Sequence, residues 1–204
     1  MSLRPEIIIT NKARFIELLR NNIKREGADI EGLINKLENS DFFSAPASTQ
    51  YHNSFEGGLC AHCLNVYDQL INVVKSQFTE DSSISNETIT IVSLLHDLSK
   101  MNFYETSMRN VKDENGNWTK VPFIKVREKE NRFIYSDHGT NSEYMVGRFI
   151  PLSIEESAAI IHHMGWSDEH TNSNTISQVF ERYPLALYLH IADCLATYVN
   201  EKVM

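Results

Sequence analysis

Apolar residues recur at every third or fourth position along most of the chain, which is the period of a helix with one buried face. Two such stripes lie in residues 1–50 and predict two N-terminal helices that pack against the rest of the protein. They are formed by Phe15, Leu18, Leu19 and Ile23 and by Ile30, Leu33, Ile34 and Leu37.

The same period predicts five further helices after residue 57, each with a recognisable start. The start signals are Gly57-Gly58, Ser85 with Asn86, the return of the helical period at His138, the capping box of Ser153 with Glu156, and Pro184. In a capping box, the serine and a glutamate three residues later satisfy two backbone N–H groups at the start of a helix. The second of these five helices ends on His96-Asp97.

The helical period disappears between Met101 and Tyr135. There Asn115-Gly116 lies between extended segments, and this dipeptide is typical of the tight turn of a β-hairpin. The sequence therefore predicts an all-α fold with a small β-hairpin insert at about 101–135. No repeat or linker interrupts the chain, so we expect one domain over 1–204, with N-terminal packing helices over 1–50 and a core over 51–200.

The composition is that of an ordinary globular protein, and it disfavours several classes of function. Nineteen Lys and Arg against 27 Asp and Glu give a net charge of −8, which argues against binding of long nucleic acid. No segment reaches the run of about 20 apolar residues that a membrane span requires, and the first residues lack a signal peptide. Three cysteines argue against a secreted disulfide framework. We therefore expect a cytoplasmic protein with no membrane and no long nucleic acid as partner.

The predicted hairpin is basic, although the chain as a whole is acidic. Residues 101–135 carry seven Lys and Arg and five Asp and Glu, a local charge of +2. Two interpretations stay open: a solvated hairpin of mixed charge, or a lid that supplies cations to an anionic substrate. On the second interpretation, Lys125 and Arg127 are the candidate substrate-binding residues.

Five of the eight histidines lie on apolar helical stripes or at helix ends beside them. They are His62, His96, His138, His162 and His163. Any one of them alone is best explained as a core histidine with satisfied hydrogen bonds, because an unsatisfied buried polar group costs about 1–3 kcal/mol. Asp193 changes this interpretation, since it interrupts an otherwise apolar helix and a buried carboxylate needs a cation or several donors.

The pair His96-Asp97 indicates which cation to expect. Imidazole with carboxylate suits Mn²⁺, Fe²⁺, Co²⁺, Ni²⁺ or Zn²⁺, and the lack of a set of thiolates argues against a structural zinc site. Lys100 follows one turn after Asp97. Its ammonium either binds a phosphate oxygen or a metal-bound water, or caps the helix end as a solvent-facing cation.

The order of these residues resembles the H…HD…D signature of the HD superfamily of metal-dependent phosphohydrolases. The local contexts are similar as well. Gly57-Gly58-Leu59 before His62 resembles the family's Gly-Gly-Leu-x-x-His, Leu95-His96-Asp97 before Lys100 resembles its apolar-HD-x-x-Lys, and Ala192-Asp193 resembles its closing Ala-Asp. The similarity spans about residues 51–200.

This resemblance implies a helical HD domain in which His62, His96, Asp97 and Asp193 bind a divalent metal. Some branches hold a second ion through additional histidines, with the HD aspartate bridging the two ions. His138 and His163 match that pattern, and His162 matches it less securely, so these three are candidates for a second metal or phosphate site. The cofactor is then one or two ions of Mn, Fe, Co, Ni, Zn or Mg.

The activity that the resemblance implies is hydrolysis of a phosphate ester of a nucleotide or small phosphorylated metabolite by metal-activated water, with Asp97 and Lys100 as catalytic residues. Two alternatives stay open: a phosphodiesterase acting on an oligonucleotide or signalling dinucleotide, and a non-catalytic module that binds a metal or nucleotide. The chain lacks the glycine-tyrosine-proline motif of the branch that cleaves cyclic dinucleotides. The sequence leaves a homodimer open.

Overall fold

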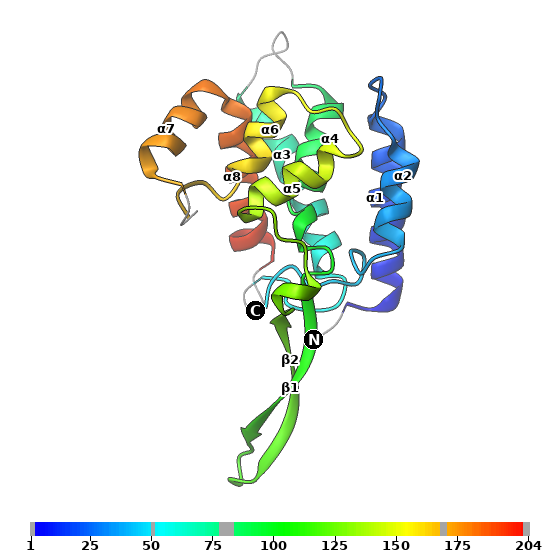
Figure 1. Ribbon diagram of the computed structural model, residues 1–204, viewed down its shortest axis with the longest axis vertical. Coiled ribbons are helices and arrows are strands. Elements are labelled where there is room, and N and C mark those ends of the chain that lie inside the picture. Colours follow the sequence, from blue (N-terminus) through cyan, green and yellow to red (C-terminus); the bar gives the residue numbers. More distant parts are fainter. Residues whose placement is uncertain (1–2, 50–51, 78–83, 168–170, 202–204) are drawn as a thin grey trace.

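Eight α-helices and one two-stranded sheet form the computed structural model, which describes residues 3–49, 52–77, 84–167 and 171–201 (Figure 1). The helices are α1 (Pro5–Asn22), α2 (Ile30–Glu38), α3 (Gly58–Gln77), α4 (Asn86–Leu95), α5 (His138–Gly147), α6 (Ile154–Ile161), α7 (Ser173–Arg182) and α8 (Pro184–Leu195). The strands are β1 (Tyr104–Lys112) and β2 (Trp118–Val126). The predicted helical fold with a small hairpin is confirmed at this level.

The N-terminal helices α1 and α2 lie side by side along one edge of the molecule (Figure 1). The stripes predicted from the sequence are their buried faces, with Phe15 and Leu19 of α1 and Leu33 and Leu37 of α2 fully enclosed. α1 packs against α3 and α4. α1 therefore covers one side of α3, which carries His62, and of α4, which leads to His96.

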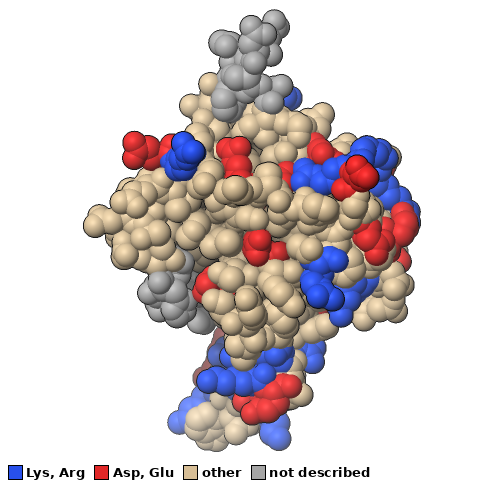
Figure 2. Space-filling model, turned by 45° about the horizontal axis from the view of Figure 1, so that its top comes forward, with Lys and Arg blue, Asp and Glu red and all other residues tan. Residues whose placement is uncertain are grey.

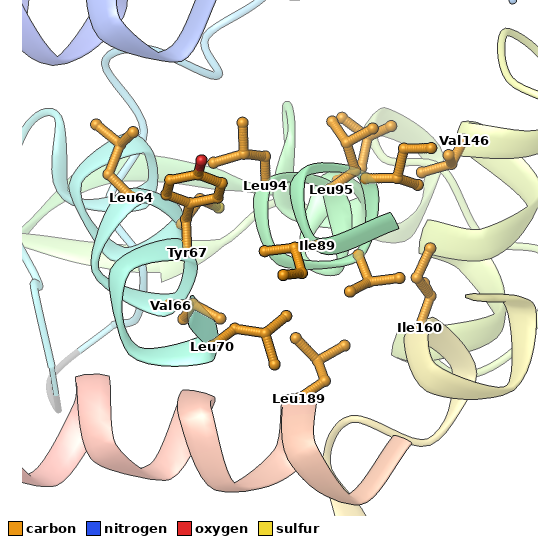
Figure 3. Packing of buried hydrophobic residues seen from close by; sticks show 14 of the residues in the cluster. Leu64, Val66, Tyr67, Leu70, Ile89, Leu94, Leu95, Val146, Ile160 and Leu189 are labelled. Carbon is orange, nitrogen blue, oxygen red and sulfur yellow. The ribbon is translucent and has the colours of Figure 1, made fainter. Parts of the chain in front are cut away.

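The central core lies between α3, α4, α6 and α8. α3 packs against both α4 and α8, and α6 packs against both of these as well. Figure 3 shows Leu70 of α3 and Ile89 of α4 directed toward Leu189 of α8 and Ile160 of α6. Replacing a fully buried leucine such as Leu70 with alanine costs about 2–5 kcal/mol of stability. This packing fixes the positions of the helix ends described below.

Two predicted helix starts are confirmed in detail. The Ser85 hydroxyl accepts a hydrogen bond from the Thr88 N–H at 3.0 Å at the start of α4. Ser153 and Glu156 form the predicted capping box of α6, with hydrogen bonds of 3.2 Å and 2.9 Å. Each side chain satisfies a backbone N–H that has no partner within its own helix.

The sequence analysis did not predict α7. Its buried face holds only Ile176 and Phe180, and polar residues occupy most of its other positions. Asn172 caps the helix by accepting a hydrogen bond from the Thr175 N–H at 2.9 Å. Ile176, Val179 and Phe180 do fall at helical spacing, so the sequence carries a short helical signal here that our sequence analysis did not use. The helix packs against α8.

The predicted hairpin is confirmed, with its strands inside the expected range and extending away from the helices (Figure 1). β1 pairs antiparallel with β2 from Tyr104 opposite Val126 to Lys112 opposite Trp118. At the turn, the Asp113 carboxylate accepts hydrogen bonds from two backbone N–H groups, and Gly116 has a φ of +81°. A positive φ is strained for residues with a Cβ, which explains the glycine there.

Acidic and basic side chains are mixed on the face shown in Figure 2, both on the hairpin and along the edge formed by α1 and α2. This view shows no continuous basic stripe of the kind that attracts a long polyanion. None of the described helices is long and apolar enough to cross a bilayer.

Candidate metal centre

Six ionisable side chains from five elements of the helical core converge on one buried place. His62 lies on α3, His96 and Asp97 follow α4, His138 opens α5, His163 follows α6, and Asp193 lies on α8. His62, His96, Asp97 and His163 are each at most 1% exposed. The structure thus brings together all four predicted metal ligands and two of the three histidines predicted for a second site.

Asp97 lies at the centre of this cluster and presents its two oxygens to different partners. Oδ2 lies 3.6 Å from Nε2 of His62 and 3.6 Å from Nε2 of His96. Oδ1 lies 2.5 Å from Nε2 of His138 and 3.6 Å from Nε2 of His163. One carboxylate therefore separates two pairs of imidazoles, with each pair facing a different oxygen.

In His96 and His163, the hydrogen bond made by Nδ1 determines whether Nε2 carries a hydrogen. Nδ1 of His96 donates to the Ser93 carbonyl at 2.8 Å, and Nδ1 of His163 donates to the Ile160 carbonyl at 2.7 Å. Since a carbonyl only accepts, each Nδ1 carries the hydrogen, and in the neutral ring Nε2 carries a lone pair. Both Nε2 atoms are buried and have no hydrogen-bond partner. Burying a polar atom without a partner costs folding free energy, and binding of a cation to Nε2 would remove that cost.

His138 is oriented in the same way by two serines. Nδ1 of His138 lies 2.7 Å from the Ser99 hydroxyl, which also receives a hydrogen bond from the Ser142 hydroxyl at 3.0 Å and donates to the His138 carbonyl. Its Nε2 then faces Asp97 Oδ1 as one acceptor facing another, a contact that requires a proton or a cation between them. Burial lowers the pKa of His138, so a proton is disfavoured there.

His62 is held by a carboxylate that the sequence analysis missed. Nδ1 of His62 lies 3.1 Å from Oε1 of Glu201, and the Asn65 side chain donates to the same oxygen at 2.8 Å. Nε2 of His62 lies 3.2 Å from Oδ1 of Asp193. Glu201 follows a π-helical turn over Ala196–Asn200 and gave no signal in the sequence, because one glutamate near the end of a helix is usually a surface residue.

The charges of the cluster favour a cation. Burial disfavours the charged imidazole of His62, yet hydrogen bonds to Asp193 and Glu201 outweigh it and raise its pKa to about 10. Burial would raise the pKa of Asp97, but Lys100, His96 and His138 hold it well below its usual range. Burial lowers the pKa of His96 to about 3. The carboxylates are thus ionised at neutral pH, and a divalent cation among them would displace the proton from the imidazole of His62.

The donor set fits a divalent transition metal. Among the described residues there are four close-set groups of three possible ligands, with atoms within 4.8 Å of one another. They are His62, His96 and Asp97; His96, His163 and Asp193; Asp97, His138 and His163; and, on the outer side of His62, His52, His62 and Glu201. Imidazole nitrogens and carboxylate oxygens suit Mn, Fe, Co, Ni and Zn. These buried groups could therefore hold a metal ion.

A cavity of about 280 Å³ lies beside the cluster. Asp97, Asp193 and Lys100 form part of its wall, and Nζ of Lys100 lies 2.6 Å from Oδ2 of Asp97. Further polar atoms of the wall come from His52, Ser167, His190, Thr197 and Tyr198. A small molecule in this cavity would contact both the metal ligands and the lysine.

Three predicted site residues lie elsewhere. His162 belongs to none of the ligand groups found among the described residues, whereas its neighbour His163 belongs to two. Nζ of Lys125 pairs with Glu105 at 2.9 Å, and Arg127 donates to the Tyr104 carbonyl at 2.8 Å. Neither cation lines the cavity beside the cluster. Arg127 also lies 3.5 Å from the Asp41 carboxylate. Both cations thus have partners away from the cluster.

A close approach between α5 and α6 brings His138 to His163. Gly139, the second residue of α5, is buried, and a Cβ there would overlap the carbonyl oxygen of Ile161 at the end of α6. Only glycine allows this distance between the two backbones. The rings of His138 and His163 then lie 5.2 Å apart, centre to centre.

A comparison with known protein families, with curated proteins and with solved structures finds no match to this chain. The geometry itself defines the class of site: a buried cluster of imidazoles and carboxylates, able to hold a metal ion, beside a cavity that contains one lysine.

Proposed function

We propose that this protein is a metal-dependent phosphohydrolase of the HD type, which cleaves a phosphate ester of a nucleotide or small phosphorylated metabolite. The observation that carries the proposal is the pair of buried, unpartnered Nε2 atoms of His96 and His163, each with its Nδ1 hydrogen-bonded to a carbonyl. These hydrogen bonds leave the Nε2 lone pair of each ring free to bind a divalent cation. The order of ligands along the chain matches the HD signature, which supports the assignment to that superfamily.

Two ions fit the cluster better than one. Oδ2 of Asp97 faces His62 and His96, while Oδ1 faces His138 and His163. A carboxylate whose two oxygens face separate ligand groups can bridge two ions. We assign His62, His96, Asp97 and Asp193 to the first ion and His138, His163 and the other oxygen of Asp97 to the second.

Ions bound in this way would polarise a phosphoryl oxygen and lower the pKa of a coordinated water. The chain's own contribution is Lys100. The carboxylate of Asp97 outweighs the effect of burial and raises the pKa of the Lys100 ammonium, so the side chain stays charged. It lines the cavity and can neutralise the negative charge that develops on a phosphate during hydrolysis.

The size of the cavity favours a small substrate. Its volume of about 280 Å³ accommodates a phosphate with a compact organic group and not an extended oligonucleotide. The hydroxyls of Ser167, Thr197 and Tyr198 lie in the wall and can bind the polar groups of a sugar. This favours a phosphomonoester over the alternative of oligonucleotide processing.

The cysteines support a cytoplasmic location. Cys60, Cys63 and Cys194 form no disulfide, and burial raises the pKa of Cys60 to about 12. Unpaired, neutral thiols are typical of a reducing compartment. We accordingly propose a cytoplasmic, single-domain enzyme.

Metal analysis followed by an activity panel tests the function. We expect the purified protein to contain a divalent transition metal and, with Mn²⁺, Co²⁺, Ni²⁺ or Mg²⁺ added, to release phosphate from nucleoside monophosphates or sugar phosphates. Protein that binds none of these ions and releases no phosphate would contradict the proposal. A ladder of shortened oligonucleotides would instead identify a phosphodiesterase.

A further inference from the structure

A second and larger cavity lies on the other side of the turn that follows Asp97. Its volume is about 600 Å³, within the range of about 300–1,000 Å³ that is usual for small-molecule sites. Residues from α2, from the turn after α4, from the segment after β2 and from α5 line it. None of its lining residues also lines the cavity beside the metal centre.

One part of the wall of this second cavity is apolar and another is aromatic. Leu33, Leu98 and Met101 are buried residues of the wall. Phe133 and Tyr144 also line the cavity, with ring centres 5.7 Å apart and planes inclined by only 12°. Tyr144 also stacks on Tyr135, with ring centres 4.9 Å apart, so its ring already has two aromatic neighbours. Phe133 is 40% exposed and keeps free ring surface. Exposed aromatic faces of this kind can stack on a planar ring of a ligand.

Three cations lie on the same wall without acidic partners. No ion pair joins Lys36, Arg132 or Arg148 to a carboxylate within the described parts of the chain. Nε of Arg132 is in addition buried without a hydrogen-bond partner, while its guanidinium lies 5.0 Å from the centre of the Phe103 ring. Glu130 is the acidic residue of the lining, so the wall carries a net charge of about +2.

We propose that this cavity binds a small aromatic phosphate monoester or an equivalent ring-bearing dianion. The ring stacks on the exposed surface of Phe133, and the anionic group binds Lys36, Arg132 and Arg148. A phosphate monoester carries about −1.5 to −2 charges at pH 7, which matches the excess of cations. Arginine forms paired hydrogen bonds to phosphate, and Arg132 and Arg148 both line the cavity. This site does not depend on the function proposed for the metal centre.

Calorimetric titration of the purified full-length protein tests this proposal with naphthylmethylphosphonate. The compound has an aromatic ring and a dianionic group but no phosphate ester bond, so the protein cannot hydrolyse it as an ester. Methylphosphonate lacks the ring and naphthylmethanol lacks the charge. We expect naphthylmethylphosphonate to bind at least about tenfold more tightly than either fragment, because the site uses both parts. Equal affinity for methylphosphonate and naphthylmethylphosphonate would overturn the proposal.

Substitutions locate the binding. Arg148→Glu and Lys36→Glu each reverse an exposed charge of the cavity and should weaken binding by about tenfold or more. Phe133→Leu keeps an apolar side chain but removes the stacking surface, and it should weaken binding of both ring-bearing compounds. Lys120→Glu, an exposed residue of β2 outside the cavity, is the matched control and should bind normally. Unchanged binding by Arg148→Glu, Lys36→Glu and Phe133→Leu, or loss of binding only with Lys100→Gln in the other cavity, would overturn the assignment.

Discussion

The Glu201 carboxylate lies 3.1 Å from Nδ1 of His62, a hydrogen bond between residues 139 positions apart in the chain. Asn65 donates to the same carboxylate, and Glu201 is only 7% exposed. A carboxylate that accepts a hydrogen bond from Nδ1 fixes the orientation of an imidazole whose Nε2 binds a metal, and it increases the basicity of that Nε2. The end of the chain that the structure describes thus reaches back to hold the first predicted metal ligand.

Glu201→Gln should lower metal affinity about 10- to 100-fold, because the amide keeps the shape of the side chain but loses the negative charge that supports His62. Competition with a chromophoric chelator measures the affinity. Glu181→Gln, which removes an exposed acid of α7, is the control and should bind metal like the unmodified protein. Equal affinity for the Glu201 and Glu181 variants would mean that Glu201 has no effect on the metal centre.

The neighbours His162 and His163 provide a matched pair of substitutions. His163→Ala removes a buried ligand of the proposed second ion, and bound metal should fall by about one ion per chain with loss of phosphatase activity. His162→Ala should retain both metal and activity, since His162 belongs to none of the described ligand groups. Elemental analysis of the two purified variants shows which of the two histidines is needed for the second ion. The reverse result would exchange the roles of the two histidines.

The ion pair of Glu156 with Arg25 should make stability depend on pH. Glu156 is 1% exposed, accepts two hydrogen bonds of 2.7 Å from Arg25, and receives another from Thr88. Burial would raise the pKa of Glu156, but these hydrogen bonds hold it below its usual value. Its stabilising contribution is therefore complete above the unfolded-state pKa of about 4.3 and is lost as the pH falls through the lower folded-state value.

Accordingly, Glu156→Gln should lower the free energy of unfolding by about 2 kcal/mol near pH 7. The difference from the unmodified protein should shrink below about pH 4, where the glutamate itself becomes protonated. Urea unfolding at several pH values measures both effects. Glu31→Gln removes the exposed pair with Arg20 and should change stability little at any pH. A constant difference between Glu156→Gln and the unmodified protein down to pH 3 would contradict this account.

The sequence predicted those parts of the site that repeat a helical period or a short motif. His62, His96, Asp97 and Asp193 lie on or beside apolar stripes, which drew attention to them, but it was the resemblance of their order to the HD signature that implied one ligand set. Most helices were found from the apolar stripes alone. The supporting residue Glu201 was missed because its role depends on where a distant segment folds back, and no local pattern records that.

The hairpin shows which features a local sequence pattern predicts and which it does not. Its strands and turn were predicted, because Asn115-Gly116 determines the turn locally. The direction in which it projects depends on how the segments around it pack, so its charge alone could not decide between a solvated hairpin and a lid that brings Lys125 to a substrate. Local chemistry predicts elements, whereas the partners of a surface cation are decided by tertiary structure.

The contact between α5 and α6 gives a final prediction, which links packing to metal binding. A Cβ at Gly139 would overlap the Ile161 carbonyl, so Gly139→Ala must push α5 away from α6 and move His138 from its place beside Asp97. We expect a loss of about 1–3 kcal/mol in unfolding free energy and weaker metal binding. Thermal unfolding with and without added metal measures both.

Gly147→Ala is the matched control for this effect. Gly147 lies in the same helix, and a Cβ there would meet no atom within 4 Å. Alanine at an open helical position should raise stability by about 0.5–1 kcal/mol, because it restricts the unfolded chain and favours the helix. If Gly139→Ala is as stable as Gly147→Ala and binds metal equally well, the α5–α6 contact does not set the spacing of the proposed second ion's ligands.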